Sequence, residues 1–190
     1  VSDLLSLPRA GQYGVILADP PWLFRTYSHP VEGRVPQRAT RQHYNVENTD
    51  DLAMLPVREI AAPNCALFMW VVGSHLEHAI DIAHVWGFNF KTTGFVWRKP
   101  SIGMGYWTRK RTETCLLFTR GKPKRISAGV DELIEAPRRE HSRKPDEQYE
   151  RIERLVAGPY VELFARQARP GWDAWGNEVD KFAPAQVAAE

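Results

Sequence analysis

The chain has 190 residues, of which 43% are hydrophobic, enough to form the core of one domain. Charged residues make up 25%, as in an ordinary globular protein and not a disordered one. The longest apolar run, residues 65–72, is too short to span a bilayer, and residues 1–20 lack the pattern of a signal peptide. These features exclude a membrane-spanning protein and favour a cytoplasmic one.

The small net charge of +2 hides an uneven distribution of basic residues. Residues 98–144 contain thirteen Lys and Arg against five Asp and Glu, and residues 24–44 contain four Arg against one Glu. The two segments are either solvated loops or the two sides of a path for a polyanion. Charge alone favours the solvated loops.

The first half of the chain contains two expected strands and one expected helix. Residues 13–18 and 65–72 are apolar enough to form buried strands. Ser74 and Glu77 have the spacing of a capping box, which predicts the start of a helix. Gly87 is expected to end that helix as a left-handed cap residue.

The second half continues the alternation of strands and helices. We expect strands over 93–97, 114–119 and 160–165, and a helix over 142–156 that begins near a proline. This order predicts one three-layer α/β domain, with a mostly parallel sheet and helices on both faces. In such sheets a ligand lies beyond the carboxyl ends of the strands.

Cysteine and histidine residues give no sign of a disulfide framework or a metal site. Cys65 and Cys115 lie in apolar segments, so buried free thiols are favoured over a disulfide. His75 and His78 are three residues apart on the expected helix, but no Cys or acidic ligand accompanies them. We therefore expect no metal.

The tetrapeptide Asp19-Pro20-Pro21-Trp22 follows the first strand directly and is the clearest candidate for catalysis. The prolines stiffen the backbone, so the Pro20 carbonyl can point outward as a hydrogen-bond acceptor beside the Asp19 carboxylate. Trp22 offers a flat face for stacking. Two acceptors and a plane suit an exocyclic amine, whose nitrogen gains positive charge during methyl transfer. The alternative is a proline turn with a core tryptophan.

Ten sequence blocks between Tyr13 and Val179 resemble a known family in the same order. They are residues 18–22, 67–71, 85–88, 96–99, 105–107, 113–116, 142–147, 152–155, 162–166 and 175–178. On these blocks the chain resembles the METTL-type N6-adenine methyltransferases, similar to the catalytic subunit of the mRNA adenosine methylase. The resemblance implies a single Rossmann-like class I methyltransferase domain over 1–190, circularly permuted so that the catalytic motif precedes the cofactor motif.

The same resemblance implies S-adenosyl-L-methionine as cofactor. The implied cofactor-binding residues are Leu4, Asp19, Lys144, Glu162, Leu163, Phe164, Arg166, Asn177 and Glu178. Among them, Asp19 would lie at the methionine end, Lys144 at the carboxylate and Arg166 at the ribose. Glu178 departs from the glutamine of the mRNA enzyme, and the residues after Arg166 lack its His-Asn pair.

Two loops, residues 24–48 and 99–113, are expected to bind substrate, and residues 180–190 to form a C-terminal tail. The substrate-binding candidates are Trp22, Tyr44, Lys99, Trp107, Arg109, Lys110 and Arg111. Tyr44 matches an aromatic residue that the family carries beside the target adenine. Trp107 and the three basic residues after it could grip the nucleic-acid backbone.

The sequence therefore predicts methyl transfer to the N6 amino group of a flipped or single-stranded adenine in DNA. RNA is the alternative polymer; we favour DNA by analogy, because the chain has no RNA-recognition module and compact relatives are prokaryotic or phage-encoded. A catalytically silent nucleic-acid-binding subunit is disfavoured, because Asp19 and Trp22 are intact. A homodimer, or a heterodimer with a related subunit, is a further expectation.

Overall fold

The computed structural model describes residues 3–22, 49–103, 105, 107–140 and 143–182. Tyr44, the expected substrate loop 24–48 and most of the expected tail lie outside these residues.

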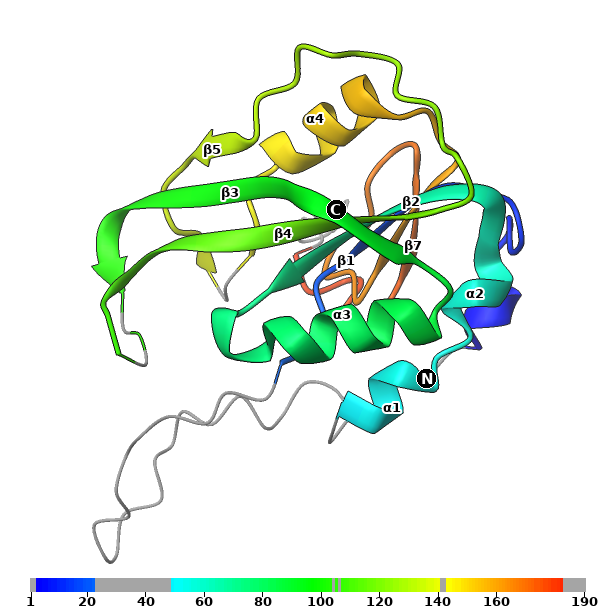
Figure 1. Cartoon of the computed structure of the whole chain (residues 1–190), viewed down its shortest axis with the longest axis horizontal. Helices are drawn as coiled ribbons and strands as arrows, with labels where there is room; N and C mark the ends of the chain where they lie inside the picture. Colours follow the sequence, from blue (N-terminus) through cyan, green and yellow to red (C-terminus); the bar gives the residue numbers. More distant parts are fainter. Residues whose placement is uncertain (1–2, 23–48, 104, 106, 141–142, 183–190) are drawn as a thin grey trace, which may run out of the picture.

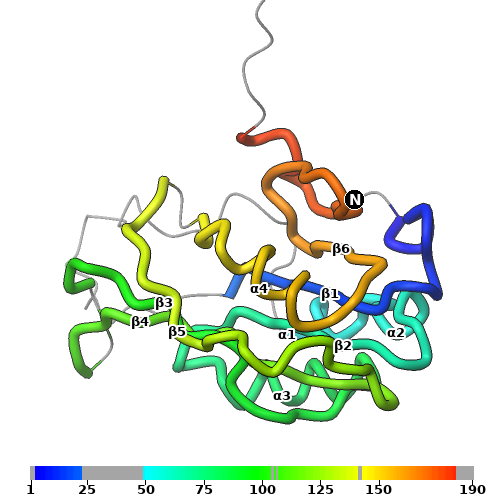
Figure 2. Tube along the Cα trace, turned by 90° about the horizontal axis from the view of Figure 1, so that it is seen from above, coloured from blue at the N-terminus to red at the C-terminus, as the bar shows by residue number. Residues whose placement is uncertain are grey.

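A seven-stranded sheet forms the centre of the domain, with the order β5-β3-β4-β2-β1-β6-β7 (Figure 1). The strands are β1 (Tyr13–Ala18), β2 (Ala61–Val71), β3 (Asn89–Gly103), β4 (Lys110–Arg120), β5 (Leu133–Glu135), β6 (Tyr160–Leu163) and β7 (Trp172–Trp175). β1 pairs in parallel with β2 and β6, β6 with β7, and β3 with β5, whereas β4 is antiparallel to β2 and β3. The sheet is therefore mostly parallel, as predicted, and Figure 2 traces β1 between β2 and β6.

Helices cover both faces of this sheet, which also confirms the prediction (Figure 1). They are α1 (Thr49–Ala53), α2 (Val57–Ile60), α3 (Leu76–Val85) and α4 (Glu147–Leu155). Ile16 of β1 packs in the same core cluster as Ile82 of α3, whereas Leu17 packs in a second cluster with Ile152 of α4. Neighbouring residues of β1 thus point to opposite faces, as in a strand covered on both sides.

The buried tryptophans and cysteines belong to this core. Trp70, Trp86 and Trp97 are each 1% exposed, and each indole N–H donates to a protein oxygen at 2.6 to 3.1 Å. Such partners are expected because a buried indole N–H without an acceptor is costly. Cys65 and Cys115 are buried free thiols, as predicted.

The expected capping box of the first helix is absent, and the second helix begins later than expected. Residues 73–75 form the 3₁₀ turn η2 (Gly73–His75), and α3 begins at Leu76 with no side-chain cap. The Ser74 hydroxyl contacts the His75 ring instead of completing a capping box. The end of α3 is as predicted, because Gly87, which follows it, has a left-handed φ of +84°. The second helix begins at Glu147 and not at residue 142. A residue before proline is disfavoured in a helix, so Lys144 stays outside it.

The expected substrate loop over 99–113 is also wrong in its boundaries. Residues 99–103 belong to β3 and residues 110–113 to β4, which together form a long hairpin. The pairing of Arg98 with Thr112 and of Gly103 with Lys110 extends the ladder past Val71, where β2 ends opposite Thr114. The backbone hydrogen bonds of this segment are therefore made within the hairpin.

Among the described residues, none of the helices is long and apolar enough to cross a bilayer.

Candidate active site

Five of the residues predicted to bind the cofactor meet at one cavity, at the carboxyl ends of β1 and β6. Ala18 pairs with Leu163 at the ends of these two strands, so the residues that follow them emerge side by side. The residues lining the cavity are Asp19, Arg143, Lys144, Gln148, Tyr149, Glu162, Phe164, Arg166, Gln167 and Phe182. The cavity lies where a ligand is expected in a sheet of this kind.

An ion pair between Asp19 and Lys144 lies in the lining of this cavity. The Lys144 ammonium donates to both carboxylate oxygens of Asp19, at 2.7 and 2.8 Å, and its side chain is only 10% exposed. The same ammonium lies 3.4 Å from Glu113, which also binds Lys99. Burial opposes the charge of Lys144, but Asp19 and Glu113 outweigh it, so the pKa of Lys144 is raised.

Glu113 is a site residue that the sequence analysis did not identify. It lies on β4, and burial alone would raise its pKa, but Lys144 and Lys99 together lower it. Its carboxylate therefore stays charged and holds Lys144 together with Asp19. The signal in the sequence that could have identified Glu113 is its position apart from the other four acids of the basic segment 98–144.

Glu162 adds a second carboxyl group to the cavity. Its side chain is buried and accepts a 2.9 Å hydrogen bond from the Tyr149 hydroxyl. Burial raises the pKa of Glu162 to about 7, and the nearby Asp19 charge adds to this. Near neutral pH the group can therefore donate or accept a hydrogen bond, which suits a ligand hydroxyl.

The catalytic turn differs from expectation in two respects. The Pro20 carbonyl accepts a hydrogen bond from the Trp22 N–H at 2.9 Å, so it is not free, although one lone pair remains. Trp22 is 6% exposed, and its indole N–H donates to the Trp70 carbonyl at 2.8 Å. Much of the expected stacking plane is therefore packed against the protein, and the indole fixes the turn to β2.

Phe164 is held in an unusual backbone conformation, with a φ of 61° directly after β6. The next residue, Ala165, donates its N–H to the Trp175 carbonyl at 2.9 Å, and the Trp175 ring meets Phe164 edge-on at 5.5 Å. A Cβ on Gly176 would lie 2.8 Å from the Ala165 backbone. Only a glycine allows this approach, which keeps Phe164 at the cavity wall.

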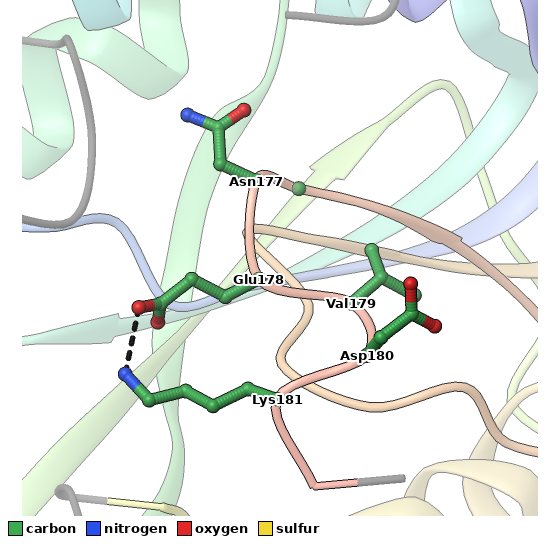
Figure 3. Close-up of a pocket in the computed structure, with 6 residues that line it drawn as sticks. Asn177, Glu178, Val179, Asp180 and Lys181 are labelled. Atoms are coloured by element: carbon green, nitrogen blue, oxygen red, sulfur yellow. Dashed lines mark hydrogen bonds and ion pairs between the residues drawn. The ribbon is translucent and has the colours of Figure 1, made fainter.

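Asn177 and Glu178 lie on the turn after β7, beside a second hollow lined by residues 176–181 (Figure 3). Glu178 binds Lys181 at 2.6 Å and Arg166 at 3.6 Å, and Arg166 links it to the first cavity. The Asn177 side chain points away from the Glu178–Lys181 pair (Figure 3).

The remaining predicted residues do not line the first cavity. Leu4 and Leu163 are buried in the core cluster that includes α3. Lys99 is paired with Glu113. Trp107 is 91% exposed on the β3–β4 hairpin, where Arg109, Lys110 and Arg111 are exposed as well.

The fold and the cavity define an α/β enzyme with a polar ligand site at the carboxyl edge of its sheet. The MT-A70 family model matches residues 13–178. Type II methyltransferase M.MunI of Mycoplasma sp. is 35% identical over 187 residues, covering 91% of this chain and 80% of that protein. The N(6)-adenosine-methyltransferase catalytic subunit METTL3 of Homo sapiens is 29% identical over 182 residues, covering 90% of this chain and 29% of that protein. The chain belongs to the MT-A70 family of N6-adenine methyltransferases.

Proposed function

We propose that this protein methylates the N6 amino group of adenine in DNA. The observation that carries the chemistry is the Asp19–Lys144 ion pair at the carboxyl edge of the sheet. The choice of DNA is supported by M.MunI, a type II methyltransferase matched over 80% of its length, whereas METTL3 is matched over 29%. RNA adenosine remains the second candidate polymer, because the METTL3 match covers nearly the whole of this chain.

The donor set of the cavity fits S-adenosyl-L-methionine, the cofactor of this family. We propose that Lys144 holds the carboxylate of its methionine part and that Asp19 receives its ammonium group. Glu162 and Arg166 offer partners for ribose hydroxyls, and Phe164 supplies an apolar wall. When bound, the cofactor supplies an activated methyl group on a sulfonium. The cofactor residues of β6 follow the catalytic turn of β1 along the chain, which is the permuted order that we infer.

Asp19 and Pro20 act on the target amine in this proposal. Lys144 contacts each Asp19 oxygen, and each oxygen keeps a further lone pair that can accept an N6 proton. The remaining lone pair of the Pro20 carbonyl provides the second acceptor. Paired acceptors would stabilise the positive charge that develops on N6, and the fixed turn would hold the amine toward the cofactor cavity. As N6 gains the methyl group and the methyl–sulfur bond of the sulfonium breaks, N6 must lose one proton, and Asp19 would accept it.

The test is mass spectrometry of nucleosides after the protein and cofactor have been incubated with single-stranded DNA, duplex DNA or RNA. We expect N6-methyldeoxyadenosine from DNA. A product from RNA alone would contradict the choice of polymer, and the absence of methylated adenine from all three would contradict the proposed function.

Cellular context is also a proposal. We infer that the protein acts in the cytoplasm of a prokaryotic or phage-infected cell. A homodimer, or a heterodimer with a related subunit, would enlarge the surface available for reading a recognition site, because one small domain offers little.

A further inference from the structure

The junction between β2 and α3 lies directly beside the catalytic turn. The His75 ring in this junction is 5.6 Å from the Trp22 ring, at an interplanar angle of 40°. The Trp22 indole in turn donates to the Trp70 carbonyl of β2. The ends of β1 and β2 are thus joined through Trp22, and His75 forms the next surface along this edge.

His75 contacts Trp22, which packs in the core cluster of α3, whereas α4 helps to line the cofactor cavity. Gln148 and Tyr149 are the residues of α4 that line that cavity. A methyl group must pass between two ligands that approach the turn from different sides. The α3 side is therefore the side left for the nucleic acid.

The Ser74 hydroxyl contacts the His75 ring instead of capping α3, although the local sequence favours a capping box. The hydroxyl lies 3.0 Å from Nδ1 of His75, so the expected capping box with Glu77 is absent and α3 begins without a side-chain cap. Departures from local sequence preference are expected at functional sites. A hydroxyl that donates to Nδ1 leaves the proton of a neutral imidazole on Nε2, where it can be donated outward.

Two further polar groups lie in or beside this junction. The His78 ring lies 5.7 Å from it, and burial together with His78 lowers the pKa of His75, which keeps the ring neutral at neutral pH. The Lys110 ammonium of β4 lies 3.7 Å from the position of a Cβ on Gly73. A cation beside Gly73 and a neutral donor beside Trp22 thus lie in one junction, which suits a nucleotide with its phosphate.

We propose that His75, oriented by Ser74, donates a hydrogen bond from Nε2 to a ring nitrogen of a nucleobase in the substrate strand. The inference rests on the proposed function and names a nucleobase contact at the same site. Adenine offers such acceptor nitrogens next to its amino group. Guanine presents an N1–H donor beside O6 and would oppose a donor at its Watson–Crick edge. Lys110 would hold the adjoining phosphate.

The first experiment compares four variants with the wild type on a DNA that the wild type methylates. We expect His75→Ala to lower kcat/KM by about tenfold, mainly through KM, because one hydrogen bond to a base is lost. His75→Gln keeps a donor and should retain most of the activity, whereas Ser74→Ala should show an intermediate loss. His84→Ala, an exposed histidine at the far end of α3, is the matched control and should leave kcat/KM unchanged.

The second experiment replaces the target adenine, or its neighbours one at a time, by 1-deazaadenine or 7-deazaadenine. The analogue that removes the contacted nitrogen should slow the wild type by the same factor as His75→Ala and should not slow His75→Ala further. An unchanged kcat/KM for His75→Ala, or an equal loss in His75→Gln with a lowered melting temperature, would overturn the inference. A wild type that methylates no DNA adenine would instead count against the proposed function.

Discussion

Replacing Lys144 by methionine removes an ammonium from between two carboxylates and keeps an apolar stem. The side chains of Lys144, Asp19 and Glu113 are 10%, 20% and 25% exposed, so this network lies between a surface pair and a fully buried one. Removing one partner of a buried pair costs about 3 to 5 kcal/mol and a surface pair contributes about 0 to 1 kcal/mol. We therefore expect Lys144→Met to lower the free energy of unfolding by roughly 2 to 3 kcal/mol at pH 7.

The pH dependence of this difference follows from the pKa shifts. The pKa of Glu113 is lowered on folding, so its stabilising contribution is present above its unfolded value of 4.5 and is lost as the pH falls through the folded pKa. The pKa of Lys144 is raised, so its contribution is present below 10.5 and is lost as the pH rises through the folded pKa. The gap between wild type and variant should be widest near neutral pH and should narrow toward both extremes.

The assay is urea unfolding followed by tryptophan fluorescence, at neutral pH and at several acidic values. Lys122→Met, at an exposed turn position, is the control and should change stability by less than about 0.5 kcal/mol. An effect of Lys144→Met no larger than that of the control, or one that is constant as the pH falls, would show that the ion pairs of Lys144 do not stabilise the fold.

Three further predictions follow from other parts of the structure. Gly176→Ala should lower stability by about 1 to 3 kcal/mol in thermal unfolding, because the new Cβ would meet the Ala165 backbone at 2.8 Å. Gly129→Ala is the control, because a Cβ there meets nothing within 4 Å. Equal melting temperatures for the two variants would argue against close packing at Gly176. Burial raises the pKa of Glu162 to about 7, so the folded chain binds that proton more tightly and loses stability as the pH rises from 4.5 through 7. Glu162→Gln should remove this decline in stability, which is on the order of 3 kcal/mol. Parallel curves of stability against pH for the two proteins would contradict the pKa shift. Replacing both Arg109 and Arg111 by alanine should weaken DNA binding and reduce the slope of log affinity against log salt concentration by about 2. Arg154→Ala on α4 is the control. An unchanged slope in the double variant would show that the hairpin does not touch phosphates.

The layer order of the fold could be predicted from sequence because it depends on local patterns. Apolar runs such as residues 13–18 and the glycine stop at Gly87 carry their own signals. The direction of a strand cannot be predicted in this way, because an alternating strand has the same pattern in both directions. The sequence therefore could not show that β4 runs antiparallel, or that it continues β3 as a hairpin beyond Val71.

The site was predictable to the extent that short motifs carry it. Asp19 follows a strand in a distinctive tetrapeptide, and the family resemblance supplied Lys144 and Arg166, which the cavity brings together. Contacts between distant residues have no local signal, so the pairing of Asp19 with Lys144 and the role of Glu113 became visible only in the fold. Ser74 was misread because a hydroxyl can cap a helix or orient a neighbouring ring equally well.

The central claim is that the Asp19 carboxylate acts on the target amine. The most direct measurement is the single-turnover rate of methyl transfer to DNA by wild type and Asp19→Asn, each saturated with S-adenosyl-L-methionine and checked for an unchanged circular dichroism spectrum. We expect a rate at least about 100-fold lower for Asp19→Asn, because the negative charge beside the positive charge that develops on N6 is lost. A folded, saturated Asp19→Asn protein that transfers methyl groups at the wild-type rate would contradict it.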